Sequence, residues 1–201
     1  MATRYGPARV DVVLPEASTG APLSLLVLGH GAGGDVDAPD LVAVREAVTP
    51  RRVAVARVPQ PYRVAGRRAP APARQLDEAW SAVIAVLRDR YGPHLPLVVG
   101  GRSSGARVAC RTAQAVGAVG VVALAFPLHP PRRPERDRAE ELRTGVPVLV
   151  VNGERDPFGI PTASSGVSVR VVPAADHSLR RDPATVAAHV LEWMTKHGWA
   201  A

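Results

Sequence analysis

Short apolar runs alternate along the chain with longer stretches in which hydrophobic and polar residues follow a helical period. The run Arg9–Leu14 alternates between apolar and polar residues, which predicts a half-buried strand that pairs with Ser24–Leu28 across the turn at Ser18–Gly20. Uninterrupted apolar runs predict strands that are buried on both faces. These runs are Ser24–Leu28, Val53–Val58, Leu97–Val99, Val119–Ala125, Val146–Val151 and Val167–Val172.

Helices are predicted between these strands. Apolar residues from Leu76 to Tyr91 recur at helical spacing and form one face of a helix over about Arg74–Tyr91. Asp182 precedes Pro183 as a cap, and Val186, Val190, Trp193 and Met194 form the inner face of the last helix. The other expected helices are Pro39–Val48 and Ser104–Val116, the latter stopped by Gly117.

This order of elements predicts an α/β fold. Strands without polar alternation are typical of a mostly parallel sheet covered by helices on both faces. Right-handed crossovers then give an open, doubly wound sheet whose ligand crevice lies at the carboxyl ends of the strands. No repeat or linker divides the chain, so residues 1–201 are expected to form a single domain.

Composition excludes several classes of protein. The chain has 201 residues, 46% hydrophobic and 21% charged, which is unlike a disordered tail. No apolar run approaches the roughly 18 residues of a membrane span, and Met1–Val13 lacks the apolar core of a signal peptide. We therefore expect a cytoplasmic protein without a membrane partner. The single cysteine, Cys110, permits neither an internal disulfide nor a cysteine zinc site, and no metal or cofactor is predicted.

The basic charge does not predict a nucleic-acid partner. Lys and Arg together number 25 against 18 Asp and Glu, a net charge of +7, and every basic residue except Lys196 is Arg. A nucleic-acid surface would gather basic residues on one face with aromatic residues among them. Aromatic residues make up only 4% of this chain and the arginines are scattered, so we interpret them mainly as a solvated basic surface.

The segment after Leu97–Val99 contains a candidate nucleophile. Gly101–Gly105 reads G-x-S-x-G, with Ser103 at its centre, and it stands between a predicted strand and a predicted helix. A sharp strand-to-helix turn exposes the serine hydroxyl, and small residues on both sides prevent clashes in that turn. The start of the helix also offers free N–H groups to a developing negative charge.

Two later loops contain the residues that such a serine requires. A base must accept the serine proton, and a carboxylate must orient the base. Asp156 follows the strand Val146–Val151, and His177 follows the strand Val167–Val172, which reproduces the chain order serine, acid, histidine. Glu154 is the competing orienting residue. Asp176 adjoins His177 and is interpreted as part of the loop structure.

The glycine-rich segment Gly29–Asp35 is predicted to complete an oxyanion hole. Its loop follows the strand Ser24–Leu28, and the backbone N–H groups of Ala32 and Ser104 are the expected donors. A phosphate-binding loop is the alternative, but the G-K-[ST] of a Walker A motif is absent. Gly29, Gly31 and Gly34 match the bare G-x-G-x-x-G spacing. However, Val53–Val58 ends without an acidic residue for a ribose.

With these motifs the chain resembles the α/β-hydrolase fold superfamily from about Leu14 to Trp193. Within it, the chain is similar to the small, lidless dienelactone-hydrolase-like group, which also includes a eukaryotic testis-expressed protein and a chromatin-complex subunit. The segments that carry the resemblance are Gly29–Asp35, Gly100–Gly105, Phe126–Pro131, Gly153–Gly159 and Asp176–Leu179. The resemblance implies an eight-stranded type of sheet, trimmed here, and a triad of Ser103, His177 and Asp156.

The loops around the predicted site suggest how a substrate could be held. Only residues 126–145 separate two predicted strands where lidded relatives insert a helical cap, so we expect no cap domain and an open site. Two arginine-rich segments, around Tyr62–Arg68 and Arg132–Arg138, border it; they could recognise an anionic substrate or form a solvated rim. The candidate substrate-binding residues are His30, Tyr62, Arg63, Arg102 and His129.

These features predict a serine hydrolase that cleaves a small carboxylic ester or thioester through an acyl-enzyme. A non-catalytic hydrolase-like scaffold is the alternative, since a fold does not imply a function. An aminopeptidase-like enzyme or a carbon–carbon hydrolase would use the same triad. The sequence leaves the acyl group, the leaving group and the oligomeric state open.

Overall fold

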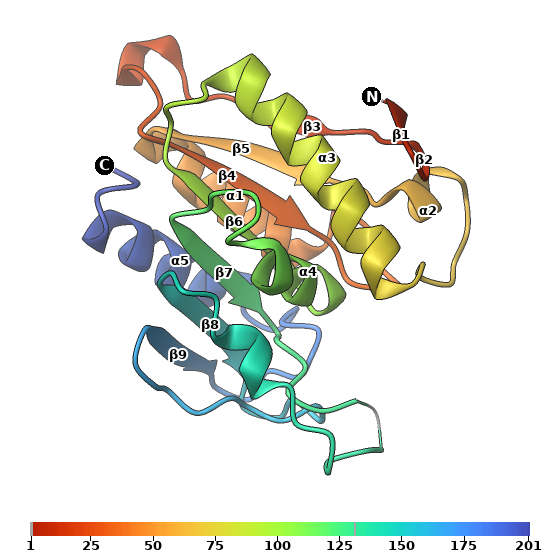
Figure 1. Ribbon diagram of the computed structural model, residues 1–201. Coiled ribbons are helices and arrows are strands. Elements are labelled where there is room, and N and C mark those ends of the chain that lie inside the picture. Colours follow the sequence, from red (N-terminus) through yellow and green to blue (C-terminus); the bar gives the residue numbers. More distant parts are fainter. Residues whose placement is uncertain (1, 131) are drawn as a thin grey trace.

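The computed structural model describes residues 2–130 and 132–201, so Met1 and Pro131 lie outside the described residues, Pro131 being the last residue of the Phe126–Pro131 segment. A seven-stranded sheet in the order β3-β5-β4-β6-β7-β8-β9 runs through its centre (Figure 1). Only the β3–β5 pair is antiparallel. The strands are β3 (Asp11–Val13), β4 (Ser24–Gly29), β5 (Val53–Val58), β6 (Leu97–Arg102), β7 (Gly120–Leu124), β8 (Val148–Gly153) and β9 (Val167–Val172).

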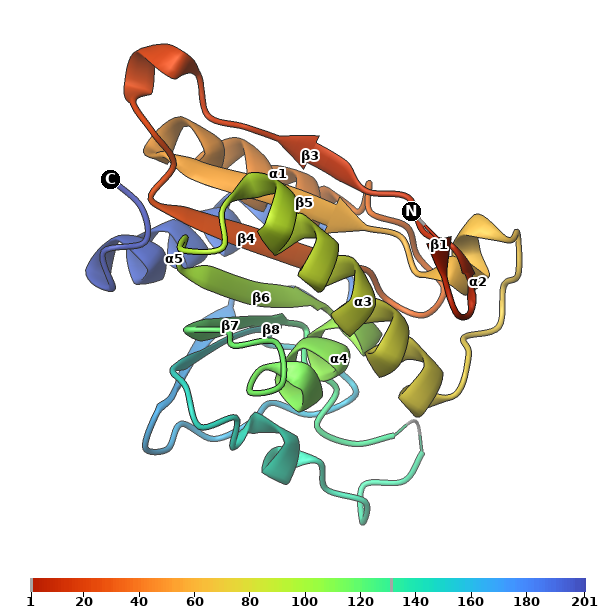
Figure 2. The ribbon, with the colours of Figure 1, turned by 45° about the horizontal axis from the view of Figure 1, so that its top comes forward.

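Helices cover both faces of the sheet, as the apolar runs predicted. In Figures 1 and 2, α3 (Ala73–Tyr91) and α4 (Ser104–Thr112) lie on one face, with α1 (Pro39–Val48) and α5 (Pro183–Lys196) on the other. Strand β4 shows why both faces need covering. Leu25 and Val27 pack in the core with α3 and α4, whereas Leu26 and Leu28 pack in the core with α1 and α5. Successive side chains of a strand point to opposite faces, so an uninterrupted apolar run requires two apolar layers.

The short elements were not predicted. They are the hairpin β1 (Ala2–Thr3) with β2 (Gly6–Pro7), the helix α2 (Pro61–Val64) and the 3₁₀ turns η1 (Ala17–Thr19), η2 (Thr49–Arg51) and η3 (Ala139–Leu142). Each is too short to show a hydrophobic period. Between β7 and β8, the one-turn η3 is the only helical segment in the described part of the chain, so there is no separate cap domain. No helix among the described residues has the length and apolar character needed to cross a membrane.

The predicted pairing of the first two strands is wrong. β3 does not lie beside β4 but forms the antiparallel edge next to β5, with Asp11 opposite Arg57. β4 is buried along its whole length and pairs in parallel with β5 and β6, whereas β3 is only half-buried. A half-buried strand tolerates the sheet edge, and an ion pair between Asp11 and Arg57 ties it there.

Several predicted boundaries move by a few residues. β6 extends beyond Val99 to Arg102, and β8 occupies Val148–Gly153 rather than Val146–Val151. α4 ends at Thr112 instead of Val116, where the Thr112 hydroxyl donates to the carbonyl of Val108. The predicted cap of α5 is confirmed, because Asp182 accepts the backbone N–H of Thr185.

Candidate active site

Ser103 occupies a strained turn between β6 and α4. Its φ of 52° and ψ of −109° lie outside the regions that non-glycine residues ordinarily adopt, while its N–H donates to Leu124 O at 2.9 Å. Close packing explains the flanking glycines. A Cβ on Gly101 would lie 2.5 Å from Gly29 O, and a Cβ on Gly105 would lie 2.6 Å from the same carbonyl group. The G-x-S-x-G pattern is therefore what permits this turn to pack against the end of β4.

His177 lies between Ser103 and Asp156. Its Nε2 is 3.0 Å from Ser103 Oγ, and its Nδ1 is 2.8 Å from Asp156 Oδ2. An ionised carboxylate only accepts hydrogen bonds, so the imidazole proton belongs on Nδ1 and the lone pair on Nε2 faces the serine hydroxyl. The ring of Phe158 meets His177 edge-on, with the centroids 4.3 Å apart. The imidazole is thus held at three points.

The side chain of Asp156 is itself fully buried and held. Its Oδ1 accepts the N–H of Phe158 at 2.9 Å, and Asn152 Nδ2 lies 3.3 Å from its Oδ2. Glu154, the competing residue, is exposed and accepts the N–H of Ala174 instead. Asp176 accepts the N–H and hydroxyl of Ser178, which is a loop-structuring arrangement and lowers the pKa of Asp176.

Sequence reasoning missed Asn152. This fully buried amide lies in β8 and accepts the N–H of Phe126, while its Nδ2 donates to the carbonyls of Phe126 and Gly159. It thereby ties the loops after β7 and β8 around Asp156. The available signal was a lone polar side chain near the end of an otherwise apolar strand, where a buried polar group must find partners.

His30 and Tyr62 brace the loop that follows β4. His30 Nδ1 lies 2.7 Å from Gly31 O, and its Nε2 accepts the N–H of Gln60 at 3.0 Å. His30 is therefore neutral with its proton on Nδ1, consistent with burial lowering its pKa. The hydroxyl of Tyr62 donates to Ala32 O at 2.9 Å. Both side chains act on loop carbonyls, which fixes the direction of the peptide groups between them.

The two expected oxyanion donors have no acceptor in the described part of the protein. Ala32 lies in the braced loop, and Ser104 is the first residue of α4, where backbone N–H groups have no partner within the helix. The positive end of the helix dipole adds to the field at Ser104. An arrangement of this kind can stabilise an oxygen that gains negative charge.

The remaining three candidate substrate-binding residues have different surroundings. The side chain of Arg102 contacts two other segments: its Nη2 donates to His177 O at 2.9 Å, and its Nε lies 3.1 Å from Asp40 Oδ2. Arg63, in α2, forms no ion pair with any residue that the structure describes. His129 lies against Gly159, and its buried Nδ1 has no hydrogen-bond partner among residues 2–130 and 132–201.

Other candidate chemistry lies elsewhere. Cys110 is buried in α4, where burial raises the pKa of its thiol to about 12, so it is not a nucleophile near neutral pH. Within the described residues, no group of three or more His, Cys, Asp or Glu side chains could hold a metal ion.

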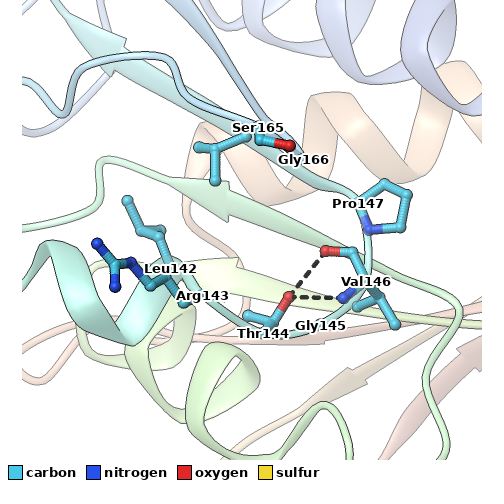
Figure 3. A pocket seen from close by; sticks show the side chains of 9 residues that line it. Leu142, Arg143, Thr144, Gly145, Val146, Pro147, Ser165 and Gly166 are labelled. Carbon is cyan, nitrogen blue, oxygen red and sulfur yellow. Dashed lines mark hydrogen bonds between the residues drawn. The ribbon is translucent and has the colours of Figure 1, made fainter.

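A hollow of about 460 Å³ lies at the amino ends of β8 and β9 (Figure 3). It is lined by residues 142–147 and 165–167. Ser103, by contrast, follows the carboxyl end of β6, which runs parallel to the rest of that half of the sheet. The hollow therefore lies at the opposite edge of the sheet from the candidate nucleophile.

Comparison with known proteins agrees with this architecture. A model of the alpha/beta hydrolase domain family matches residues 22–195. No curated protein matches the chain. Among solved structures, a lidless α/β serine hydrolase from Xanthomonas campestris has 20% identity over 96% of this chain and 91% of that one, with a TM-score of 0.77.

Two further structures show the same fold. An α/β serine hydrolase homologue from Coxiella burnetii has 16% identity, covers 96% of this chain and 95% of its own, and has a TM-score of 0.78. A dienelactone hydrolase from Anabaena variabilis has 18% identity, covers 94% and 91%, and has a TM-score of 0.72.

Proposed function

The chain belongs to the alpha/beta hydrolase domain family, and on that premise we propose that it is a serine hydrolase that cleaves a small carboxylic ester or thioester. The observation that carries the proposal is the hydrogen-bonded line from Ser103 Oγ through His177 to Asp156 Oδ2. These groups come from three separate loops and meet at one edge of the sheet. A scaffold that acts only through its surface has no need of this alignment or of the strained turn at Ser103.

Each group has a defined role in the proposed reaction. His177 Nε2 takes the proton of Ser103 as Oγ attacks the carbonyl carbon, and Asp156 stabilises the imidazolium that results. The N–H groups of Ala32 and Ser104 hold the oxyanion. His177 then gives its proton to the departing alcohol or thiol, which leaves an acyl group on Ser103. A water molecule, activated by the same imidazole, releases the acid and restores the serine.

The short connection between β7 and β8 supports a small or accessible substrate. A lid would enclose a long acyl chain, but the described part of this connection contains only the single turn η3. The acyl group of a long-chain ester would thus remain largely in water, without the apolar burial that favours its binding. We propose that short-chain esters or thioesters are the preferred class.

Covalent labelling of Ser103 tests the proposal. A fluorophosphonate probe should label the wild-type protein, and Ser103→Ala should abolish both labelling and ester turnover. Ser81→Ala is the matched control, because the Ser81 hydroxyl bonds to Asp77 O within α3 and faces no base. Mass spectrometry of the labelled peptide identifies the modified residue. Labelling that survives Ser103→Ala would place the nucleophile elsewhere, and an unlabelled wild-type protein would favour the non-catalytic alternative.

A further inference from the structure

A buried ion pair adjoins the candidate catalytic residues, because Arg102 directly precedes Ser103. The side chain of Asp40, in the first turn of α1, is 0% exposed, and that of Arg102 is 15% exposed. Arg102 Nε is 3.1 Å from Asp40 Oδ2, which is an ion pair without hydrogen-bond geometry among the described residues. Burial raises the pKa of Asp40, and the adjacent guanidinium opposes that rise. Burying a carboxylate costs free energy, so a buried ion pair adds little to the stability of a fold. Such a pair is easier to explain if it also holds neighbouring groups in position.

Arg102 joins three parts of the site, one through its backbone and two through its guanidinium. Arg102 directly precedes Ser103, so its backbone belongs to the nucleophile turn. Its Nη2 donates to the backbone carbonyl of His177 at 2.9 Å. Its Nη1 lies against the loop after β4, where a Cβ added to Gly31 would approach it to 3.3 Å. The side chain therefore joins the loops that carry the nucleophile, the base and the oxyanion donors.

We propose that Asp40 and Arg102 form a positioning pair for the serine hydrolase reaction, an inference that rests on the proposed function. The carboxylate of Asp40 fixes the orientation of the guanidinium, and the guanidinium fixes the backbone of His177 relative to Ser103. Neither residue touches the reacting atoms. Lysine would not replace Arg102 here, because the planar guanidinium reaches the His177 carbonyl and the Asp40 carboxylate at once, whereas an ammonium group is a point charge.

The pair predicts an effect on turnover rather than on substrate binding. Loss of the bond to the His177 carbonyl lets the imidazole drift from Ser103 Oγ, and a misplacement of about 1 Å can lower a rate by about 10²-fold. The substrate's own contacts are untouched, so we expect KM to change less than about twofold. We expect kcat to fall by about 10- to 100-fold.

A charge-neutral double variant separates positioning from stability. Arg102→Met alone leaves the buried Asp40 carboxylate without its partner, which destabilises the fold. Asp40→Asn together with Arg102→Met removes both charges, so no buried charge is left without a partner. We therefore expect the double variant to regain most of the wild-type stability while kcat stays low, because the His177 carbonyl still lacks its donor.

The experiment measures urea unfolding, kcat and KM for a short-chain ester, and the rate of fluorophosphonate labelling. Arg107→Met is the matched control, since it removes an arginine that pairs with Glu141 on the outer side of α4, and its kcat should stay at the wild-type value. Recovery of kcat together with stability in the double variant would overturn the positioning role. If the wild-type protein itself is not labelled at Ser103, the proposed function fails instead, and this inference fails with it.

Discussion

The parallel strands give the central sheet a carboxyl edge, where the strands end, and an amino edge, where they begin. These two edges differ in backbone strain. At the carboxyl edge, non-glycine residues with positive φ follow three of the parallel strands: Ser103 follows β6, Ala125 and Arg132 follow β7, and Ala174 and Leu179 follow β9. At the amino edge only Arg52, before β5, has this conformation among the described residues. Left-handed backbone costs an L-residue free energy, so a fold retains it where the surrounding contacts impose it.

Buried polar groups show the same asymmetry. Several polar side chains are buried at the carboxyl edge, and hydrogen bonds from some of them connect separate loops. They are His30, Asp40, Gln60, Asn152 and Asp156. At the amino edge, Ser24 and Thr144 each donate to a backbone carbonyl, and Trp193, His197 and Trp199 form an aromatic cluster. The hollow in Figure 3 belongs to this amino edge. Strain and connected buried polarity therefore distinguish the candidate site better than the size of a cavity does.

The largest expected effect concerns the acid at the carboxyl edge. Asp156→Asn should lower kcat by about 10⁴-fold, as in serine proteases, because an amide can stabilise the wrong tautomer of His177. Glu154→Gln is the matched control, since Glu154 bonds to the N–H of Ala174 and not to His177. Steady-state ester hydrolysis measures both. A larger loss in Glu154→Gln than in Asp156→Asn would reverse the assignment of the acid.

Crowding variants at the two edges should separate folding from catalysis. A Cβ on Gly105 would lie 2.6 Å from the Gly29 backbone, whereas a Cβ on Gly120 would lie 2.5 Å from the ring of Trp199. Both substitutions to Ala should destabilise the fold by about 1–3 kcal/mol through overpacking. For Gly105 the preference of a helix for Ala over Gly, about 1 kcal/mol, offsets part of this cost.

Only Gly105→Ala should also lower turnover per folded molecule, because Gly29 leads into the loop that holds Ala32. Urea unfolding gives the stability, and active-site labelling gives the folded, competent fraction. If Gly120→Ala lowered turnover as strongly as Gly105→Ala, the two edges would not be functionally distinct.

The core of the fold was predictable from the sequence because each strand carries its own apolar run. The face of α3 follows directly from the spacing of its buried residues, among them Leu76, Trp80 and Leu87. The partner of β3 was not predictable from local pattern, since its place at the edge depends on an ion pair with the distant Arg57. Strand pairing is decided between elements, whereas periodicity describes each element alone.

The residues brought together at the candidate site were predictable where a motif sets their spacing. Ser103, Asp156 and His177 each follow a predicted strand, so a parallel sheet places their loops at one edge. The environment of Arg102 was not predictable in the same way. Its sequence position suggested a substrate contact, but its partners Asp40 and the His177 carbonyl belong to distant segments.

The smallest expected effect is a pH dependence of stability that arises at the carboxyl edge. Burial lowers the pKa of His30 below its unfolded value of about 6.5. As the pH falls through about 6.5, the unfolded chain binds a proton that native His30 does not. The free energy of unfolding therefore decreases as the pH decreases, by up to about 1.4 kcal/mol per pH unit, until the native pKa is reached.

His30→Gln should remove this contribution, because glutamine does not titrate and its amide oxygen can still accept the N–H of Gln60. Urea unfolding at about pH 7.5 and about pH 5.5, on either side of the unfolded pKa, measures the difference. Thr144→Val is the control at the amino edge. It loses the bond to Val146 O, at a cost of about 1 kcal/mol, but should keep the wild-type pH difference. An unchanged pH difference in His30→Gln would mean that native His30 binds its proton as readily as the unfolded chain does, contrary to its burial and its bond from Gln60 N–H.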